Sequence, residues 1–359
     1  MASHGTPTRA AKSMDTFPVS MTIRDVARAA GVGVGTISRV LNESPQVSAA
    51  TRKRVMNAIR RLDFRPHAQA RRIHGRHSKM VCFLLSNRDF LHPFHARILE
   101  GVEKYASSLK RHVIFAAIHY SPRVRPQEID LPPVLQERGL VDGLILAGTT
   151  YPNFLTRIAS IQTPFVAFSN NVVGLDGQFQ FDGVGFDGVQ GAEDETRYLI
   201  GEGHHRIAFV ADIKLPWFAS RLDGYRLAMR EAKLRPTSFA AGETRGFVEL
   251  GRAVTERMLA RRPKLTAIVA GNDEIAYGIW RALRQKGVRV PHDISLVGFD
   301  DRDEAMLMDP PLTTVRVHKE EIGEACMKML LERLRHPEMA FSRRILPTEL
   351  VVRESVCHI

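Results

Sequence analysis

The stretch TIRDVARAAGVGVGTISRVL, residues 22–41, decides the fold of the N-terminal part of the chain. Thr22 and Asp25 have the spacing of a capping box, and apolar residues then recur every three or four positions until Gly31 ends the helix. A second apolar stripe at helical spacing follows in the letters TISRVL. Two short helices joined by a turn that contains glycine predict a helix-turn-helix.

A basic third helix is predicted to follow from Ser48 to Leu62. Its exposed side is expected to carry five cations: Arg52, Lys53, Arg54, Arg60 and Arg61. The first 79 residues hold 15 Lys and Arg against 4 Asp and Glu, and so carry +11 of the net charge of +12. A basic block in front of a nearly neutral remainder is typical of a nucleic-acid-binding domain joined to a separate body.

The composition places the rest of the chain among ordinary folded proteins. The 359 residues are 44% hydrophobic and 25% charged, and no run of about 18 apolar residues predicts a membrane span. The three cysteines are odd in number and have no paired spacing, which argues against a disulfide framework and against a zinc site. We expect residues 1–20 to form a flexible tail, and we expect the protein to be cytoplasmic.

From residue 79 onward, short apolar strands alternate with helices. Strands are expected at 80–85, 113–118, 141–146, 165–168, 206–210, 267–270 and 294–298, and helices at 96–109, 193–200, 222–233 and 274–286. Such alternation predicts parallel, doubly wound sheets. Because the pattern runs through two sets, it predicts two similar lobes, and ligands of such sheets bind at the carboxyl ends of the strands.

The N-terminal part resembles the lactose-repressor (LacI/GalR) family of transcription regulators. The matching stretches there are Asp25-Val26-Ala27, Ala30-Gly31-Val32, Thr36-Ile37-Ser38-Arg39-Val40-Leu41-Asn42, Val47-Ser48 and Thr51-Arg52. Further matches are His92-Pro93-Phe94, Gly203-His204-His205-Arg206, Asn272-Asp273, Asp293-Ile294-Ser295-Leu296-Val297-Gly298-Phe299-Asp300-Asp301 and Pro311-Leu312-Thr313-Thr314. The resemblance, over about residues 21–355, implies an N-terminal all-α helix-turn-helix domain plus an α/β two-lobed sensor domain like a type I periplasmic binding protein.

The resemblance also implies the order of the domains. We expect the tail at 1–20, the helix-turn-helix domain at 21–65, a hinge helix and linker at 66–78, and the two-lobed effector-binding domain at 79–359. In this family fold the chain crosses between the lobes three times. Lobe 1 is therefore expected at about 79–178 and 317–341, and lobe 2 at about 179–314 and 343–355.

By the same resemblance, the second helix lies in the DNA major groove. Arg39 suits the O6 and N7 atoms of guanine, although a phosphate contact or a solvated arginine is the alternative. Val34 and Gly35 offer only apolar contact with thymine methyl groups or a close backbone approach. The residues expected at DNA are Thr22, Val34, Gly35, Thr36, Ser38, Arg39, Asn42, Arg71 and Ile73.

The segment after Pro66 is short, basic and only weakly helical, and alone in water it would not be a stable helix. The resemblance implies that it folds on the operator, pairs with its dimer mate and wedges Ile73 into the minor groove. The alternative is a charged linker that is ordered in neither state.

The resemblance further implies an effector pocket between the lobes. Its expected residues are Phe94, His95, Asn170, Asn171, Arg221, Phe247, Asn272 and Asp300. Arg221 can donate a fork of hydrogen bonds, and Asp300 can accept from neighbouring hydroxyls, which suits a polyol such as a sugar. Each residue also has a structural alternative. Asp300 could cap the next segment, Arg221 could pair with an acidic neighbour, and Asn272 could be a turn residue.

These observations predict a sequence-specific, DNA-binding transcriptional repressor whose affinity for operator DNA is changed by a small molecule, a sugar or a sugar derivative. The alternatives are a non-sugar effector or a corepressor, a solute-binding protein, and an enzyme on the same fold. The acidic run from Asp300 to Glu304 could suggest a metal site, but we favour a solvated acidic loop beside the cleft, because close carboxylates alone are weak evidence for a metal. We predict no catalytic residues, no cofactor and no metal. We also predict a homodimer and not a tetramer, because the C-terminal residues have no heptad pattern of a coiled coil.

Overall fold

The computed structural model describes residues 22–41, 44, 46–62, 78–89, 92–174, 180–240, 246–260 and 264–359. These residues divide into an N-terminal unit that ends before His77 and a larger unit that follows it. The expected tail at 1–20 and residues 66–77 of the expected hinge lie outside the described residues. The same holds for three of the residues expected at DNA: Asn42, Arg71 and Ile73.

The N-terminal unit consists of three helices, α1 (Ile23–Ala30), α2 (Val34–Leu41) and α3 (Ala49–Arg61). The capping box is present, because the Asp25 N–H donates to the Thr22 hydroxyl at 3.4 Å and the Thr22 N–H donates to the Asp25 carboxylate at 3.0 Å. Gly31 ends α1 with φ of 63°, a left-handed conformation that glycine adopts without steric cost. The helix-turn-helix prediction is confirmed.

Seven small or branched apolar side chains from all three helices form the core of this unit: Val26, Ala27, Ala30, Ile37, Val40, Val55 and Ala58. One cation expected on the exposed side of α3 has another position. Arg52 is only partly exposed, and its guanidinium donates to the carbonyls of Val40, at 3.4 Å, and Ser44, at 2.8 Å. The expectation for Arg52 was therefore wrong, because this side chain satisfies backbone acceptors at the end of α2.

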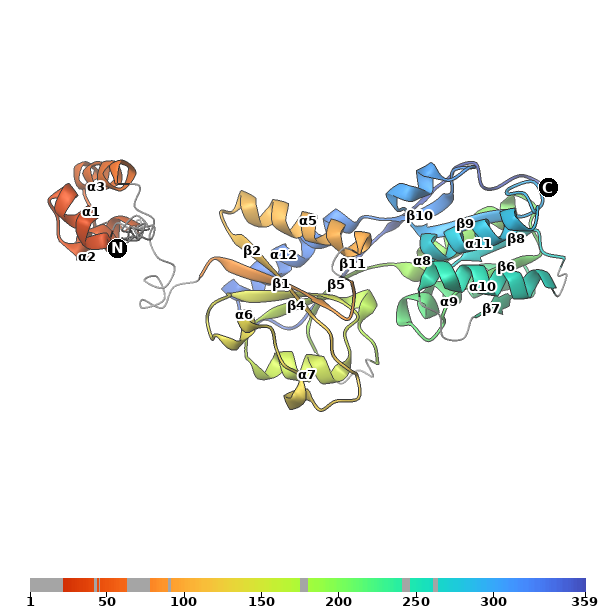
Figure 1. The fold of residues 1–359 in the computed structure, drawn as a ribbon, viewed down its shortest axis with the longest axis horizontal. Coiled ribbons are helices and arrows are strands. Elements are labelled where there is room, and N and C mark those ends of the chain that lie inside the picture. The colour runs from red at the N-terminus through yellow and green to blue at the C-terminus, as the bar shows by residue number, and fades with distance from the viewer. Residues whose placement is uncertain are drawn as a thin grey trace, which may run out of the picture. The chain divides into compact units, whose positions relative to one another are not determined.

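Two six-stranded sheets form the frame of the larger unit (Figure 1). The first has the order β11-β5-β4-β3-β1-β2, and its strands are β1 (Met80–Ser86), β2 (His112–Ile118), β3 (Gly143–Gly148), β4 (Phe165–Phe168), β5 (Asp182–Phe186) and β11 (Arg343–Leu346). The second has the order β12-β10-β9-β8-β6-β7, with β6 (Ile207–Val210), β7 (Thr237–Phe239), β8 (Ala267–Ala270), β9 (Ser295–Asp300), β10 (Thr313–Val317) and β12 (Thr348–Val351). All neighbours are parallel except β10 and β12.

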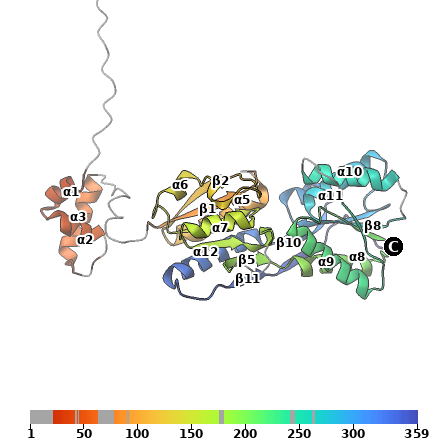
Figure 2. The ribbon, with the colours of Figure 1, turned by 90° about the horizontal axis from the view of Figure 1, so that it is seen from below.

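Helices cover both faces of each sheet (Figure 2). In the first lobe, α5 (Pro93–Ser108) and α12 (Lys319–Arg335) pack on one face, and α6 (Pro133–Gln136) and α7 (Pro152–Ser160) pack on the other. In the second lobe, the paired helices α8 (Gly188–Gly201) and α9 (Pro216–Glu231) lie opposite the pair α10 (Phe247–Ala260) and α11 (Asp273–Gln285). Short 3₁₀ turns occur at η1 (Pro126–Glu128), η2 (Ser169–Asn171) and η3 (Asp303–Leu307). The predicted fold class is confirmed.

The chain crosses between the lobes at Asp187, His318 and Pro347, each the single residue between an element of one lobe and an element of the other. The expected boundaries differ at two of the three crossings. Strand β5 belongs to the first sheet, so lobe 2 begins after residue 186 and not at 179. Strand β11 also belongs to the first sheet, so the last crossing lies at 347 and not near 342.

The sequence did not predict strand β5, because its letters, DGVGF, contain two glycines and one acidic residue among only two apolar residues. Its first residue is held from a distant part of the chain. The Arg333 guanidinium of α12 donates to the buried Asp182 carboxylate at 2.7 and 3.2 Å, and the Ser342 N–H donates to it at 3.0 Å. Buried charges need such compensation, and these contacts anchor β5 beside α12.

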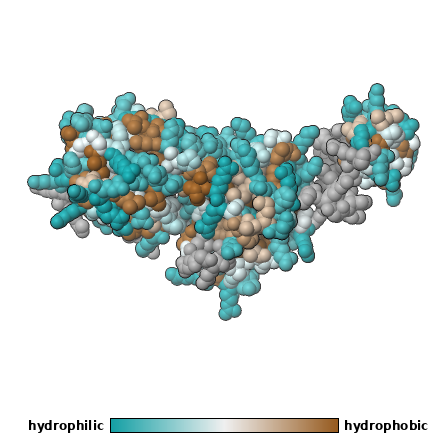
Figure 3. Space-filling model, turned by 180° about the vertical axis from the view of Figure 1, so that it is seen from behind, coloured by the Kyte–Doolittle hydropathy of each residue, from teal (hydrophilic) through white to brown (hydrophobic). Residues whose placement is uncertain are grey.

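Polar and apolar side chains are interspersed on the surface in the view of Figure 3. Large apolar residues that are more than half exposed include Met306, Leu307, Phe341, Ile345 and Val352. Within the described part of the chain, no helix has both the length and the apolar character needed to cross a lipid bilayer.

Helices α10 and α11 approach closely through two glycines. A Cβ on Gly278 would overlap the Val248 carbonyl oxygen, and a Cβ on Gly251 would overlap the Ile275 carbonyl oxygen. The backbone of each helix thus fills the space where a side chain of the other would stand. Any larger residue at these two positions must push the helices apart.

We predict that Gly278→Ala lowers the free energy of unfolding by at least about 1–3 kcal/mol, because the added methyl group meets backbone atoms. Both tryptophans, Trp217 and Trp280, lie in the second lobe, so denaturant unfolding followed by tryptophan fluorescence reports on this lobe. The matched control is Gly201→Ala at the end of α8, where a Cβ would have no atom within 4 Å. This variant should raise the free energy of unfolding by about 0.5–1 kcal/mol. Equal shifts for both variants would contradict the close approach.

Candidate functional site

The carboxyl ends of the strands carry a group of polar and aromatic side chains at the edge where the lobes meet. Asn87 and Arg88 follow β1, Asn171 follows β4, Asn272 follows β8, and Asp300 ends β9. In parallel sheets this edge is where ligands bind, because the strand order reverses there and loops leave a crevice.

A small cavity of about 40 Å³ lies among these side chains. Its lining is Arg88, His92, Phe94, His95, Asn171, Phe186, Trp217, Arg221, Phe247, Asn272 and Asp300. Seven of the eight expected effector residues are in this set, and only Asn170 is missing from it. The space is that of one or two water molecules, at roughly 30 Å³ each in the liquid. The side chains themselves therefore fill most of the inner site.

Arg221 and Asp300 form a buried ion pair at the base of this cavity. Arg221 Nη2 donates to Asp300 Oδ1 at 2.8 Å, and Nη1 donates to the Gly271 carbonyl at 2.5 Å. The guanidinium carbon lies 3.8 Å from the centre of the Phe299 ring. The two side chains are only 3% and 10% exposed, so each needs the other. The acidic partner named as an alternative for Arg221 is thus Asp300 itself.

The backbone at Asp300 is strained, with φ of 107°, and Asp301 follows with φ of 48°. Residues other than glycine seldom adopt such values, and strain of this kind gathers at functional sites. The buried Lys319 ammonium at the start of α12 donates to the carbonyls of Asp300, Asp301 and Val317. The turn at Asp300 is therefore stabilised by Lys319, which directly follows the lobe crossing at His318.

The three expected asparagines have different surroundings. Asn272 caps α11 by accepting from the Ile275 N–H at 3.0 Å, and it also lines the cavity. The Asn170 side-chain amide forms two hydrogen bonds with the backbone of Phe186, accepting from its N–H at 2.9 Å and donating to its carbonyl at 3.0 Å, and it does not line the cavity. Asn171 is buried and faces the cavity. The structure thus separates two neighbours that the sequence could not distinguish.

Aromatic rings form one wall of the cavity. Phe94 packs against Phe168 and Phe186, with ring centres 5.7 and 6.5 Å apart, and His95 stands against Phe94 edge-on at 5.4 Å. Trp217 and Phe247 face this wall from the second lobe. Rings on both sides suit a ligand with apolar faces and polar edges, such as a sugar ring.

Four lining residues were missed by the sequence reading: Arg88, His92, Phe186 and Trp217. One available signal was position, since Arg88 comes two residues after β1 and Phe186 ends β5. His92 and Trp217 stand at the starts of α5 and α9, and helix starts meet the same edge of a parallel sheet. Applying the strand-end rule to each predicted strand would have found Arg88.

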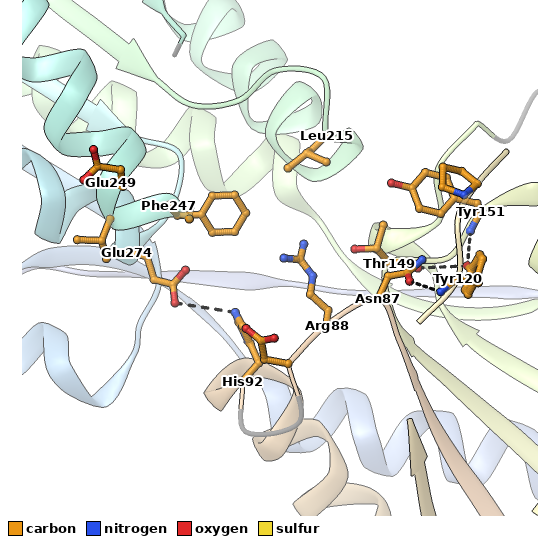
Figure 4. A pocket seen from close by; sticks show the side chains of 14 residues that line it. Asn87, Arg88, His92, Tyr120, Thr149, Tyr151, Leu215, Phe247, Glu249 and Glu274 are labelled. Atoms are coloured by element: carbon orange, nitrogen blue, oxygen red, sulfur yellow. Dashed lines mark hydrogen bonds and ion pairs between the residues drawn. The ribbon is translucent and has the colours of Figure 1, made fainter. Parts of the chain in front are cut away.

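A wider cleft of about 720 Å³ continues outward from the small cavity (Figure 4). Arg88, His92 and Phe247 line both spaces, so the two are contiguous. Its lining otherwise consists of Asn87, Asp89, Tyr120, Pro122, Thr149, Tyr151, Leu215, Gly246, Val248, Glu249 and Glu274. His92 Nε2 lies 3.9 Å from Glu274 Oε1 across the lobes. A monosaccharide-sized ligand fits this volume.

The acidic run after β9 is engaged by arginines. Asp301 lies 2.7 Å from Arg316 and 2.6 Å from Arg353, and Asp303 lies 2.8 Å from Arg97. Burial alone would raise the pKa of Asp301, but the arginine contacts outweigh it and lower that pKa. Among the residues described, no three metal-ligating side chains gather in one place.

Two buried acids stand behind the ion pair. Burial raises the pKa of Asp273 to about 7, and the nearby Asp300 adds to the effect. The Thr314 hydroxyl donates to its carboxylate at 2.6 Å and the Arg302 N–H donates at 2.7 Å. Glu195 is fully buried, neither of its carboxyl oxygens has a hydrogen-bond partner, and burial holds its pKa well above the usual value.

On the N-terminal unit, the residues expected at base edges are accessible. Val34 is 42% exposed, and Gly35 and Arg39 are exposed as well. Thr36 and Ser38 are partly exposed, while Thr22 is exposed but engaged in the α1 cap. Helix α2 therefore presents Val34, Gly35 and Arg39 away from the core of this unit.

Comparison with known proteins agrees with both units. A model of the bacterial regulatory proteins of the lacI family matches residues 22–67, and a model of the periplasmic-binding-protein-like domain matches residues 196–356. The transcriptional regulator DegA of Bacillus subtilis (strain 168) is 32% identical over 339 residues, which are 93% of this chain and 97% of its own. The ribose operon repressor of Escherichia coli (strain K12) is 32% identical over 343 residues, 93% of this chain and 99% of its own.

Solved structures agree as well. A lac repressor dimer bound to operator and the anti-inducer ONPF matches with a TM-score of 0.80 and 25% identity, over 94% of this chain and 100% of its own. The complex of the transcriptional regulator CelR with cellobiose matches with a TM-score of 0.67 and 30% identity, over 93% and 99%.

A helix-turn-helix unit joined to a two-lobed, periplasmic-binding-protein-like unit defines a DNA-binding transcription regulator. The relatives are regulators of transcription and not enzymes. The chain belongs to the lacI family of bacterial regulatory proteins.

We predict that Asp273→Asn flattens the pH dependence of stability between about pH 4 and pH 7. The folded state holds a proton on Asp273 that the unfolded chain releases near pH 3.8, so stability falls as the pH rises through this range. One such group contributes a slope of up to about 1.4 kcal/mol per pH unit. Denaturant unfolding followed by tryptophan fluorescence measures the slope, with the exposed Asp223→Asn as the control. Identical slopes for Asp273→Asn and the unsubstituted protein would contradict the prediction.

Proposed function

We propose that this protein is a homodimeric, sequence-specific repressor of transcription whose operator affinity is changed by a sugar or a sugar derivative bound between the two lobes. Two findings on relatives support the nature of the effector: two are named ribose operon repressors, and one is solved with cellobiose. The lac repressor is solved as a dimer on its operator, which supports the homodimer and the DNA partner.

The observation that carries the proposal is a cleft lined from both lobes around the buried Arg221–Asp300 pair. Arg221 keeps one buried N–H, on Nε, without a hydrogen-bond partner, and His95 keeps an unpartnered Nδ1 on the opposite lobe. Buried polar atoms in native structures are nearly always satisfied, so unpartnered ones that line a cavity favour a polar ligand. Hydroxyl groups serve such a site, because each can donate and accept.

The proposed coupling follows the course of the chain. Helix α3 is followed along the chain by β1, and β1 ends two residues before Arg88 at the cleft. The lobes are joined by three single-residue crossings, so rotation of one lobe against the other is the motion that deforms least packing. An effector that binds one lobe arrangement better than the other shifts their populations and thereby operator affinity.

For DNA reading we propose that α2 enters the major groove and that Arg39 contacts a guanine, with Val34 and Gly35 beside it. The exposure of these three residues on one helix supports the role. The wider proposal includes contacts by Thr22, Thr36, Ser38, Asn42 and Arg71, and a minor-groove wedge by Ile73.

We expect the purified protein to bind a site in the DNA upstream of its own gene, and one compound from a panel of sugars to change that affinity. Asp300→Asn should abolish the response to that compound and leave operator binding unchanged, because Asp300 lies in the larger unit. Titration at fixed salt measures both quantities, since phosphate contacts make affinity salt-dependent. Glu324→Gln, on an exposed pair in α12, is the control.

Release by the compound indicates an inducer, and tighter binding indicates a corepressor. A normal response in Asp300→Asn would move the effector away from this cleft. Operator binding that no compound of the panel changes would contradict the carbohydrate effector while leaving the DNA-binding role intact.

We predict that Arg39→Ala costs about 1–3 kcal/mol of discrimination at one base pair. The measurement compares the affinities of both proteins for the operator and for its single-base variants. Arg28→Ala, an exposed arginine of α1 that pairs with Asp25, is the control for loss of one positive charge. A uniform loss across all sequences would instead indicate a phosphate contact for Arg39.

A further inference from the structure

Arg88 stands in the middle of the cleft and points into it (Figure 4). It belongs to the first lobe, and its guanidinium carbon lies 4.9 Å from the ring centre of Trp217 and 5.7 Å from that of Phe247, both in the second lobe. Its Nε is buried without a hydrogen-bond partner. The planar cation thus lies over two aromatic rings, and its Nε–H is unsatisfied.

Four other charged side chains of the cleft are paired. Arg221 pairs with Asp300 at 2.8 Å, Glu249 pairs with Arg252 at 2.6 Å, and Glu274 contacts Arg302. Of the two arginines that line the cavities within the described residues, Arg88 alone has no carboxylate within 4 Å. The neighbouring Asp89 is exposed to solvent.

A guanidinium keeps its charge in proteins, so a half-buried one without a counter-ion is costly unless a ligand supplies the partner. Burial lowers the pKa of Arg88, and the charges of Glu274, Asp89 and Asp300 offset only part of that effect. Cation–π contact with two rings offsets part of this cost but leaves the N–H groups of the fork unused.

The helix starts around the cleft add to the positive potential. The N-cap residues of α5, α7 and α9 are His92, Tyr151 and Leu215. All three line the cleft, and none of them makes a side-chain cap hydrogen bond. The partial positive charge of these ends therefore faces the cavity. His95, only 3% exposed, adds no charge, because burial holds its pKa well below the usual value.

We propose that the effector is a sugar acid whose carboxylate is bound by Arg88, with its hydroxyl groups directed toward Arg221, Asn272 and Asp300. This inference rests on the proposed function of the cleft. A carboxylate fits better than a phosphate ester, because one uncompensated guanidinium balances a single negative charge, whereas a phosphate monoester carries about −1.5 to −2. Arg88 is then a residue that determines the specificity between acidic and neutral sugars.

The test compares matched ligands on matched variants. The probes are five- and six-carbon sugars, their uronic and aldonic acids, and their phosphate esters, measured by calorimetric titration at one pH and ionic strength. The proteins are the unsubstituted chain, Arg88→Gln, Arg88→Lys and Arg284→Gln. Arg284 is the matched control, because it also stacks on a tryptophan, with 5.2 Å to the Trp280 ring, but lies on the surface outside the cleft.

We expect one acid to bind at least about tenfold more tightly than its neutral sugar. Arg88→Gln should weaken the binding of that acid about ten- to hundredfold and the binding of the neutral sugar by less than about threefold. The reason is that a charged hydrogen bond is lost only for the acid. Arg88→Lys should keep part of the preference, since it keeps the charge. Arg284→Gln should change neither, and Arg88→Gln should melt no earlier than the unsubstituted protein.

Three results would overturn the inference. A neutral sugar that binds most tightly, with equal losses for acid and sugar in Arg88→Gln, would reduce Arg88 to a stacking residue and leave the proposed function standing. A phosphate ester that binds more tightly than the acid would show that the ligand group at Arg88 is a phosphate and not a carboxylate. If no probe binds although operator DNA does, the carbohydrate effector fails, and the acid fails with it.

Discussion

The structure depends on one constraint, which is that two sheets with the same strand order, parallel except for β12, meet at the carboxyl ends of their parallel strands. Parallel strands need crossover helices, and those helices must start where strands end, so loops and helix starts from both lobes face one another. Asn272 and Asp300 come from two neighbouring strand ends of the second sheet, and Arg88 follows β1, which lies next to the edge strand β2 of the first. The topology therefore determines where the cleft lies, and a few side chains at the strand ends determine its chemistry.

The buried pair of Arg221 and Asp300 illustrates how structural and functional roles coexist. An arginine deep in the second lobe needs a carboxylate, and that need alone accounts for the 2.8 Å contact. Yet the Asp300 backbone is left-handed, its turn is held by Lys319, and the Nε of Arg221 stays without a partner. An arrangement that served stability alone would satisfy that atom. Pairing pre-sets the geometry, and the remaining donor is available to a ligand.

The sequence predicted the elements whose pattern is local and missed those that depend on distant partners. Strands β1, β8 and β9 read as continuous apolar runs, as expected for strands buried on both faces. Strand β5 did not, because glycines replace its apolar residues and Asp182 is buried only through Arg333, 151 residues away. In the cleft, resemblance supplied Arg221 and Asp300, but neither periodicity nor resemblance could tell that Arg88 would lie on Trp217.

Arg88 also bears on how a ligand could move the lobes. It belongs to the first lobe but rests on two rings of the second, so it already links them without a ligand. A ligand that only replaced this stacking would gain no more from one lobe arrangement than Arg88 already does. It would therefore leave the populations of the two arrangements unchanged. A ligand that joins Arg88 to the Arg221–Asp300 pair contacts both lobes in one arrangement alone, and this difference in affinity is what drives a change of state. Because β1 follows the DNA-binding unit along the chain and ends two residues before Arg88, an effector bound as proposed would contact the lobe that is joined to that unit.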